Sequence, residues 1–116
     1  MVFPMPDMAG PAILILSTAA TRDEAARIAE ALVAEQLAAC IQLSPIESWY
    51  RWQGKVEHAP EIRLHIKTMT HLVDAAIQRL TALHSYDVPE VVVIALENVS
   101  ADYLAWIEAS VRAEPE

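Results

Sequence analysis

The stretch "SWYRWQGK" (residues 48–55) places three aromatic side chains in four consecutive positions and ends in a Gln-Gly-Lys sequence. Extended segments precede and follow it, at 40–52 and 56–68. A Gln-Gly pair between two such runs predicts a tight hairpin turn, because glycine adopts positive φ without steric cost. The sequence therefore predicts a long central hairpin whose tip carries Trp49, Tyr50 and Trp52.

The two arms of this hairpin carry further signals. Pro45 lacks the N–H group that a strand ladder needs, so it predicts a bulge or an unpaired edge in the first arm. Pro60 interrupts the second arm in the same way. Near its end the second arm alternates: apolar residues occupy 62, 64 and 66, and Arg63, His65 and Lys67 lie between and after them. Such alternation predicts one face on the core and one open face.

The segments on either side of the hairpin predict further strands and helices. These are a buried strand at 12–17, a helix at about 22–37 capped by Thr21 and Glu24, a second helix capped by Thr70, a core strand at 91–96 and a third helix capped by Ser100. The order predicts an α+β fold, a ferredoxin-like βαββαβ sandwich with an extra C-terminal helix and helices on one face. We expect one domain at 12–112, a disordered tail at 1–11 and a frayed end at 113–116.

The predicted hairpin is too long for one compact domain. Thirteen extended residues at 40–52 span roughly 40 Å, whereas a domain of this size has a diameter of about 35 Å. Three aromatics on an exposed two-stranded ribbon require a cover. A membrane or a nucleic acid would need a basic rim or groove, which Arg51 and Lys55 alone do not supply. We therefore expect a second copy of the chain to bury them.

Composition excludes several classes of protein. The net charge is −8, with eight Lys and Arg residues in total, so a polyanion would be repelled and nucleic-acid binding is not expected. No apolar run reaches the ~18 residues of a membrane span. Residues 1–11 hold no Lys or Arg, unlike the basic leader of a secretory signal, so we expect a cytoplasmic protein. The single cysteine, Cys40, is interpreted as a small buried hydrophobe.

Several motifs together resemble the CutA family of divalent-cation tolerance proteins. They are "AACIQL" (38–43), "WYRWQGKVE" (49–57), "EIRLHIKT" (61–68), "LHSYDVPEVVVIAL" (83–96) and "DYLAWIEASV" (102–111). The resemblance runs from about Ile13 to Val111 in register. It implies a stable homotrimer, similar in architecture to the PII signalling proteins, in which the long hairpin reaches onto neighbouring subunits. It also implies a non-enzymatic role in metal tolerance, with copper binding.

The resemblance implies a metal site in the loop "HSYDVPE" (84–90), with His84 as the imidazole ligand and Glu90 as the carboxylate. Nitrogen and oxygen donors suit Cu(II), and no tightly bound cofactor is expected beyond Cu(II) or another divalent cation. Two positions depart from the family pattern. Ser17 stands where some members have a cysteine, and Ser85 stands where a proline usually follows the histidine.

Two other functions stay open. A PII-like small-molecule sensor would bind its ligand in a cleft between subunits, near Trp52, Lys67, Tyr86 and Glu90. A pure scaffold would instead bind a protein partner. Catalysis is not predicted, since the sequence has no glycine-rich phosphate loop and no nucleophile elbow.

Overall fold

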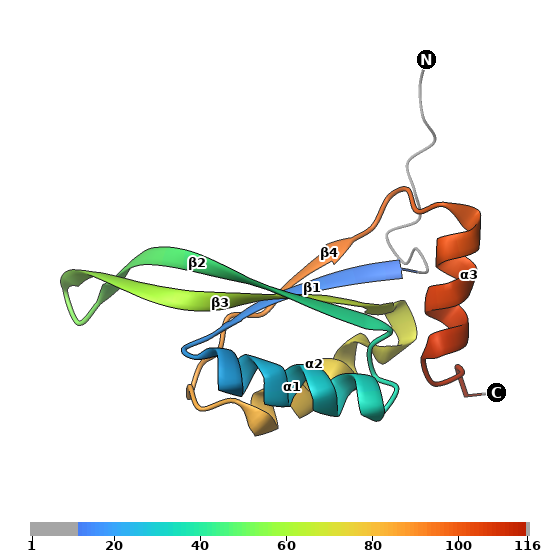
Figure 1. Ribbon diagram of the computed structural model, residues 1–116, viewed down its shortest axis with the longest axis horizontal. Helices are drawn as coiled ribbons and strands as arrows, with labels where there is room; N and C mark the ends of the chain where they lie inside the picture. The colour runs from blue at the N-terminus through green and yellow to red at the C-terminus, as the bar shows by residue number, and fades with distance from the viewer. Residues whose placement is uncertain (1–11, 116) are drawn as a thin grey trace, which may run out of the picture.

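The computed structural model describes residues 12–115, so the tail predicted at 1–11 lies outside the described residues, as does Glu116. The predicted order of elements is confirmed (Figure 1). The elements are β1 (Ala12–Ala19), α1 (Arg22–Ala34), β2 (Cys40–Trp52), β3 (Lys55–Met69), the 3₁₀ turn η1 (Thr70–Leu72), α2 (Val73–Leu83), β4 (Val92–Ala95) and α3 (Ala101–Ser110).

The strands form one antiparallel sheet in the order β2-β3-β1-β4. This order interleaves the β1-α1-β2 and β3-α2-β4 crossovers around the hairpin, as the predicted ferredoxin-like sandwich requires. α1 and α2 cover one face of the sheet, and α3 lies at the end opposite the hairpin tip (Figure 1). The core lies between the sheet and the two helices, where Leu64, Ile66 and Leu80 are almost fully buried.

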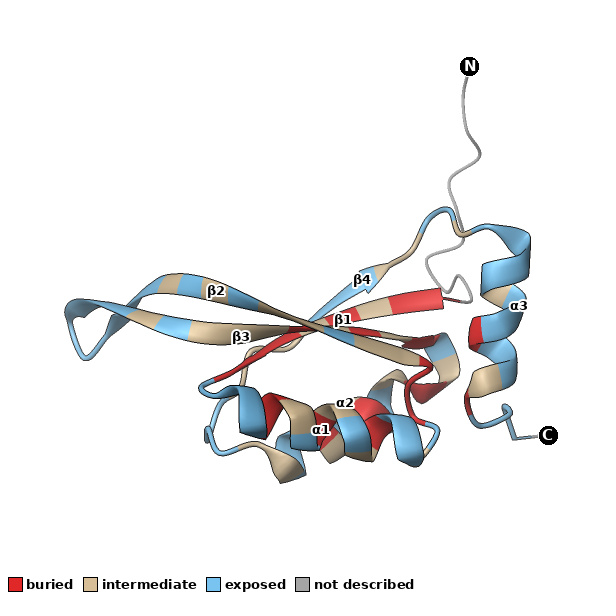
Figure 2. Ribbon diagram, viewed as in Figure 1, coloured by how far each residue is buried: buried red, intermediate tan, exposed pale blue. Residues whose placement is uncertain are grey.

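The β2–β3 hairpin extends beyond the rest of the domain. β1 pairs with β3 only from Ile62 to Met69, so residues 46–52 and 55–61 form a ribbon of two strands alone. The radius of gyration is 15.5 Å, against about 13 Å for a compact domain of this length. The ribbon is mostly exposed (Figure 2), with Trp49 64% and Trp52 61% exposed. The predicted overhang is therefore confirmed.

The hairpin turn and its prolines follow simple backbone rules. Gln53 and Gly54 have φ values of 51° and 79°, which confirms the predicted two-residue turn between paired Trp52 and Lys55. The register runs without a bulge, and Pro45 is tolerated because β2 is the edge strand of the sheet. Pro60 lies just beyond the end of the β1–β3 pairing, where β3 also has a free edge.

Two helix boundaries differ from the prediction. α1 ends at Ala34 rather than near residue 37, because Gln36 takes a left-handed φ of 59°. The amides of Gln36 and Leu37 then bond to carbonyls of the last helical turn, in a Schellman cap. The predicted cap at Thr70 was wrong: η1 occupies that position, and α2 begins at Val73 without a side-chain cap. Ser100 does occupy the N-cap of α3, but its hydroxyl makes no capping bond.

β4 is shorter and more exposed than the core strand predicted at 91–96. It covers four residues at the outer edge of the sheet. Val92, Val93 and Ile94 are each 41–45% exposed in the single chain. An apolar edge strand with this exposure is a template for contact with another chain.

Ser17 gives a prediction about stability. Its side chain is fully buried, and its hydroxyl has no hydrogen-bond partner among residues 12–115. Replacing Ser17 by alanine removes this unsatisfied group, so we expect the free energy of unfolding to rise by on the order of 1 kcal/mol in chemical denaturation.

The matched control is Thr68→Val, at another fully buried hydroxyl. Thr68 donates to the carbonyl of Leu37 at 2.7 Å, so removing its hydroxyl is expected to lower the free energy of unfolding. Equal destabilisation by both substitutions would show that the Ser17 hydroxyl is satisfied in solution.

Candidate functional site

The loop after α2 holds His84, the predicted imidazole ligand. Its Nε2–H donates to the carbonyl oxygen of Thr18 at 2.6 Å, and its Nδ1 accepts the backbone N–H of Tyr86 at 3.0 Å. This pattern assigns the neutral tautomer with the proton on Nε2. Both ring nitrogens are therefore hydrogen-bonded, and the ring also lies 4.8 Å, centroid to centroid, from that of Tyr86.

A buried carboxylate from α1 holds the same loop. Glu24 is only 6% exposed, and its Oε2 accepts the N–H of Ser85 at 2.7 Å. Burial tends to raise the pKa of Glu24, but the hydrogen bonds from Ser85 and from the backbone of Ala20 outweigh burial and lower the pKa below 4.5. The sequence predicted Glu24 only as part of the capping box, and its N–H does donate to the Thr21 hydroxyl. Its hydrogen bond with Ser85, 61 residues away, leaves no local pattern in the sequence from which it could be predicted.

Tyr86 joins the loop to the hairpin. Its hydroxyl donates to Oε2 of Glu61 on β3 at 3.2 Å. Partial burial, together with the negative charge of Glu61, raises the pKa of Tyr86 to about 12. The phenol therefore stays protonated at physiological pH and keeps its role as donor.

Glu90, the predicted carboxylate ligand, forms an ion pair with Arg63 on the open face of β3. His84 and Glu90 thus belong to the same loop but bond to different partners. Within residues 12–115, no group of three His, Cys, Asp or Glu side chains is arranged to hold a metal ion.

The residues predicted for an inter-subunit cleft lie apart within one chain. Lys67 donates to Gln42 at 3.2 Å and to the Tyr103 hydroxyl at 3.4 Å, near the α3 end of the sheet. Trp52 pairs with Lys55 at the hairpin tip. Lys55 lies twelve residues before Lys67 on β3, which is about 40 Å along the strand. Residues from a neighbouring chain are needed if Trp52 and Lys67 are to share one cleft.

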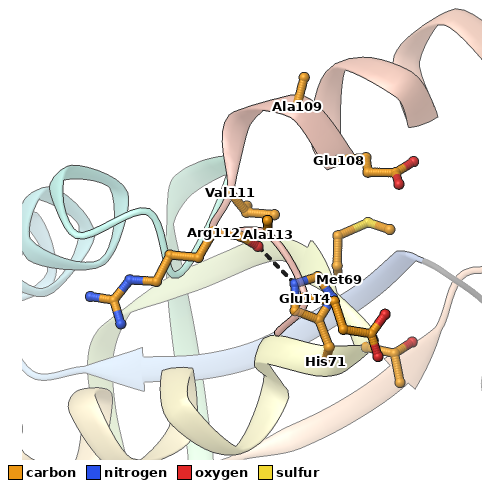
Figure 3. A pocket seen from close by; sticks show the side chains of 9 residues that line it. Met69, His71, Glu108, Ala109, Val111, Arg112, Ala113 and Glu114 are labelled. Carbon is orange, nitrogen blue, oxygen red and sulfur yellow. Dashed lines mark hydrogen bonds between the residues drawn. The ribbon is translucent and has the colours of Figure 1, made fainter. Parts of the chain in front are cut away.

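A cavity lies elsewhere, between η1 and the end of α3 (Figure 3). Its volume is about 700 Å³, and Met69, His71 and Arg112 are among its lining residues. Nε2–H of His71 donates to the carbonyl of Arg112 at 2.7 Å, which fastens the chain after α3 to η1. This cavity was not predicted from the sequence, because its walls come from segments about 40 residues apart.

The fold and the loop geometry define a class: a small α+β domain with an antiparallel sheet, an overhanging hairpin and a hydrogen-bonded loop after α2. A sequence model of the CutA1 divalent ion tolerance protein family matches residues 13–110. The chain belongs to this family.

Relatives and solved structures agree with this assignment. The chain is 41% identical over 95 residues to the divalent-cation tolerance protein CutA of Thermus thermophilus, covering 81% of this chain and 92% of the relative. It is 39% identical to protein CutA 1, chloroplastic, of Oryza sativa over 88% of this chain, but spans only 58% of that relative's length. The crystal structure of CutA from Xylella fastidiosa matches with a TM-score of 0.85 and 43% identity, over 87% of this chain and 98% of that one.

A structure from Archaeoglobus fulgidus, described as a periplasmic divalent cation tolerance protein CutA, matches with a TM-score of 0.85 at 35% identity, over 87% of this chain and 99% of that one. The relatives are thus assigned to more than one compartment. Among residues 12–115, none of the helices has the length and apolar character to cross a membrane.

Proposed function

We propose that this chain works as a non-enzymatic homotrimer in the tolerance of divalent cations, with Cu(II) as the first ion to test. The observation that carries the assembly is the overhanging ribbon, whose Trp49, Tyr50 and Trp52 are 45–64% exposed in the single chain. The metal role is supported by the family to which the chain belongs.

Two apolar surfaces support assembly with further copies. A two-stranded ribbon is marginally stable alone in water, and its aromatics each bury on the order of 150–250 Å² when covered. The exposed edge of β4 offers a second apolar surface, since Val92 and Val93 are each 45% exposed. Contact of one copy's ribbon with its neighbours would cover such surfaces without a different protein.

The metal part of the proposal begins from His84 and Glu90. A cation can bind His84 only if the ring releases the Thr18 carbonyl or the Tyr86 N–H, and Glu90 must release Arg63. Binding there would therefore rearrange the loop. Calorimetric titration of Cu(II) into the unmodified protein and His84→Ala tests this site. A lower Cu(II) stoichiometry in the variant is expected, and identical isotherms would remove His84 from the site.

A small-molecule sensor is the second candidate, and the open face of β3 favours it. Arg63, His65 and Lys67 form a row of basic side chains on a protein of net charge −8. Within residues 12–115, His65 makes no side-chain hydrogen bond or ion pair. An anionic metabolite would suit this row if it displaced Glu90 from its ion pair with Arg63. A thermal-shift screen of nucleotides and carboxylates without metal tests the idea, and no response to any of them would rule against it.

The cytoplasmic location stays a prediction for this chain, since relatives are named chloroplastic or periplasmic. Fractionation of cells that express the untagged protein would test it, and recovery outside the cytoplasm would overturn it.

A further inference from the structure

A histidine, a glutamate and a tryptophan meet on one face of the exposed ribbon. Nε2–H of His58 donates to Oε1 of Glu47 at 3.1 Å. The Trp49 indole stacks on the His58 ring, with centroids 4.0 Å apart and planes 5° apart. The side chains of His58 and Glu47 are 46% and 67% exposed in the single chain. They lie on the face of the ribbon opposite Tyr50 and Trp52, and the site requires this face to stay open to water in the assembly.

The strand register explains this arrangement. Trp49 lies directly opposite His58, and Glu47 lies opposite Pro60, two residues along β2 on the same face. Stacking fixes the plane of the imidazole, and the carboxylate fixes the direction of Nε2. Nε2 of His58 and Oε1 of Glu47 are therefore held next to each other before an ion arrives, which reduces the entropy lost on binding.

We propose that His58 and Glu47 form a divalent-cation site, in which the ion replaces the proton shared between Nε2 and Oε1. Metal bonds from imidazole and carboxylate are about 2.0–2.2 Å long, so two ligands at angles of 90–110° lie about 2.9–3.5 Å apart. The observed separation is 3.1 Å, so the ion binds once the Glu47 carboxylate has turned away from the N–H direction along which the hydrogen bond now points. Imidazole and carboxylate suit Cu(II) well, and water completes the coordination. This inference rests on the proposed role in divalent-cation handling.

The other histidines are less suited to bind a cation as the structure stands. Both nitrogens of His84 are hydrogen-bonded, and Nε2 of His71 bonds to a carbonyl. His65 lies two residues from Lys67 on the same face of β3, where the charge of Lys67 opposes a cation. Of the four histidines, only His58 donates to a carboxylate within residues 12–115.

The test is a Cu(II) titration of the full chain, followed by calorimetry and by tryptophan fluorescence. Cu(II) bound at His58 lies within a few ångströms of the stacked Trp49 ring and is expected to quench its emission. We expect His58→Ala to weaken Cu(II) binding at least tenfold and to abolish the quenching. Glu47→Gln is expected to weaken binding several-fold, because it retains an oxygen but loses the charge.

Matched controls are His71→Gln, which removes an imidazole elsewhere, and Glu57→Gln, which removes a carboxylate from the opposite face of the ribbon. Both are expected to bind as the unmodified protein does. Unchanged affinity and quenching in His58→Ala would overturn the site while leaving the proposed metal role standing. Loss of binding in His84→Ala alone would likewise overturn it and would support the loop site. No Cu(II) binding by the unmodified protein would overturn both.

Discussion

Replacing Tyr50 and Trp52 together by serine is expected to convert the assembled protein into monomers. Both side chains lie on the same face of the ribbon, because they are two residues apart on β2. They are 45% and 61% exposed in the single chain. The free energy gained by burying them is therefore obtained only when another copy covers them. Central interface aromatics contribute about 2–4 kcal/mol each, so the association constant should fall roughly a thousandfold or more.

Sedimentation velocity at micromolar concentration measures this effect. The control is Val33→Ser, which removes a 41%-exposed apolar side chain from α1, on the helical side of the sheet. This control is expected to leave the assembly intact. A double variant that sediments like the unmodified protein would show that the ribbon is not the interface.

Glu24→Gln is expected to lower the free energy of unfolding by about 1–2 kcal/mol at neutral pH, the difference between a hydrogen bond to a charged group and one to a neutral group. Glutamine keeps an oxygen that can accept the Ser85 N–H, but it lacks the negative charge that strengthens this hydrogen bond. Hydrogen exchange at the Ser85 amide should quicken at the same time. Glu30→Gln, an exposed position on the same helix, serves as control and should change little. Equal stability of all three proteins would contradict this role of Glu24.

The pH dependence of stability follows from the same contact. The folded protein lowers the pKa of Glu24 below 4.5, so the stabilisation is fully present above that value. It is lost as the pH falls through the lower folded pKa. Denaturation of equal concentrations at a series of pH values from 7 downward should therefore show a smaller loss below pH 4.5 in Glu24→Gln than in the unmodified protein. Parallel pH profiles would assign the acid sensitivity to other groups.

Local patterns in the sequence were sufficient for most of the fold. The alternation from 62 to 67 gave the correct buried face of β3, because Leu64 and Ile66 have almost no exposed surface. Gln53 and Gly54 gave the correct turn, because two consecutive positive φ values are what a tight hairpin needs. That turn also fixes the register, so the pairing of Trp49 with His58 could have been counted from the sequence.

Contacts between distant segments could not be predicted in this way. His84 bonds to Thr18, 66 residues away, and Glu24 bonds to Ser85. Neither contact has a periodicity or a spacing rule behind it. The exposure of β4 was missed for a different reason: its apolar composition predicted a core strand, but the single chain leaves three of its four residues exposed.

The mass of the untagged protein in solution tests the central claim most directly, because every proposed cleft and interface depends on assembly. Sedimentation equilibrium at micromolar concentration is expected to give about 38 kDa, three times the 12.8 kDa of one chain. A single species of 12.8 kDa, with tryptophan emission typical of fully hydrated indoles, would contradict the account.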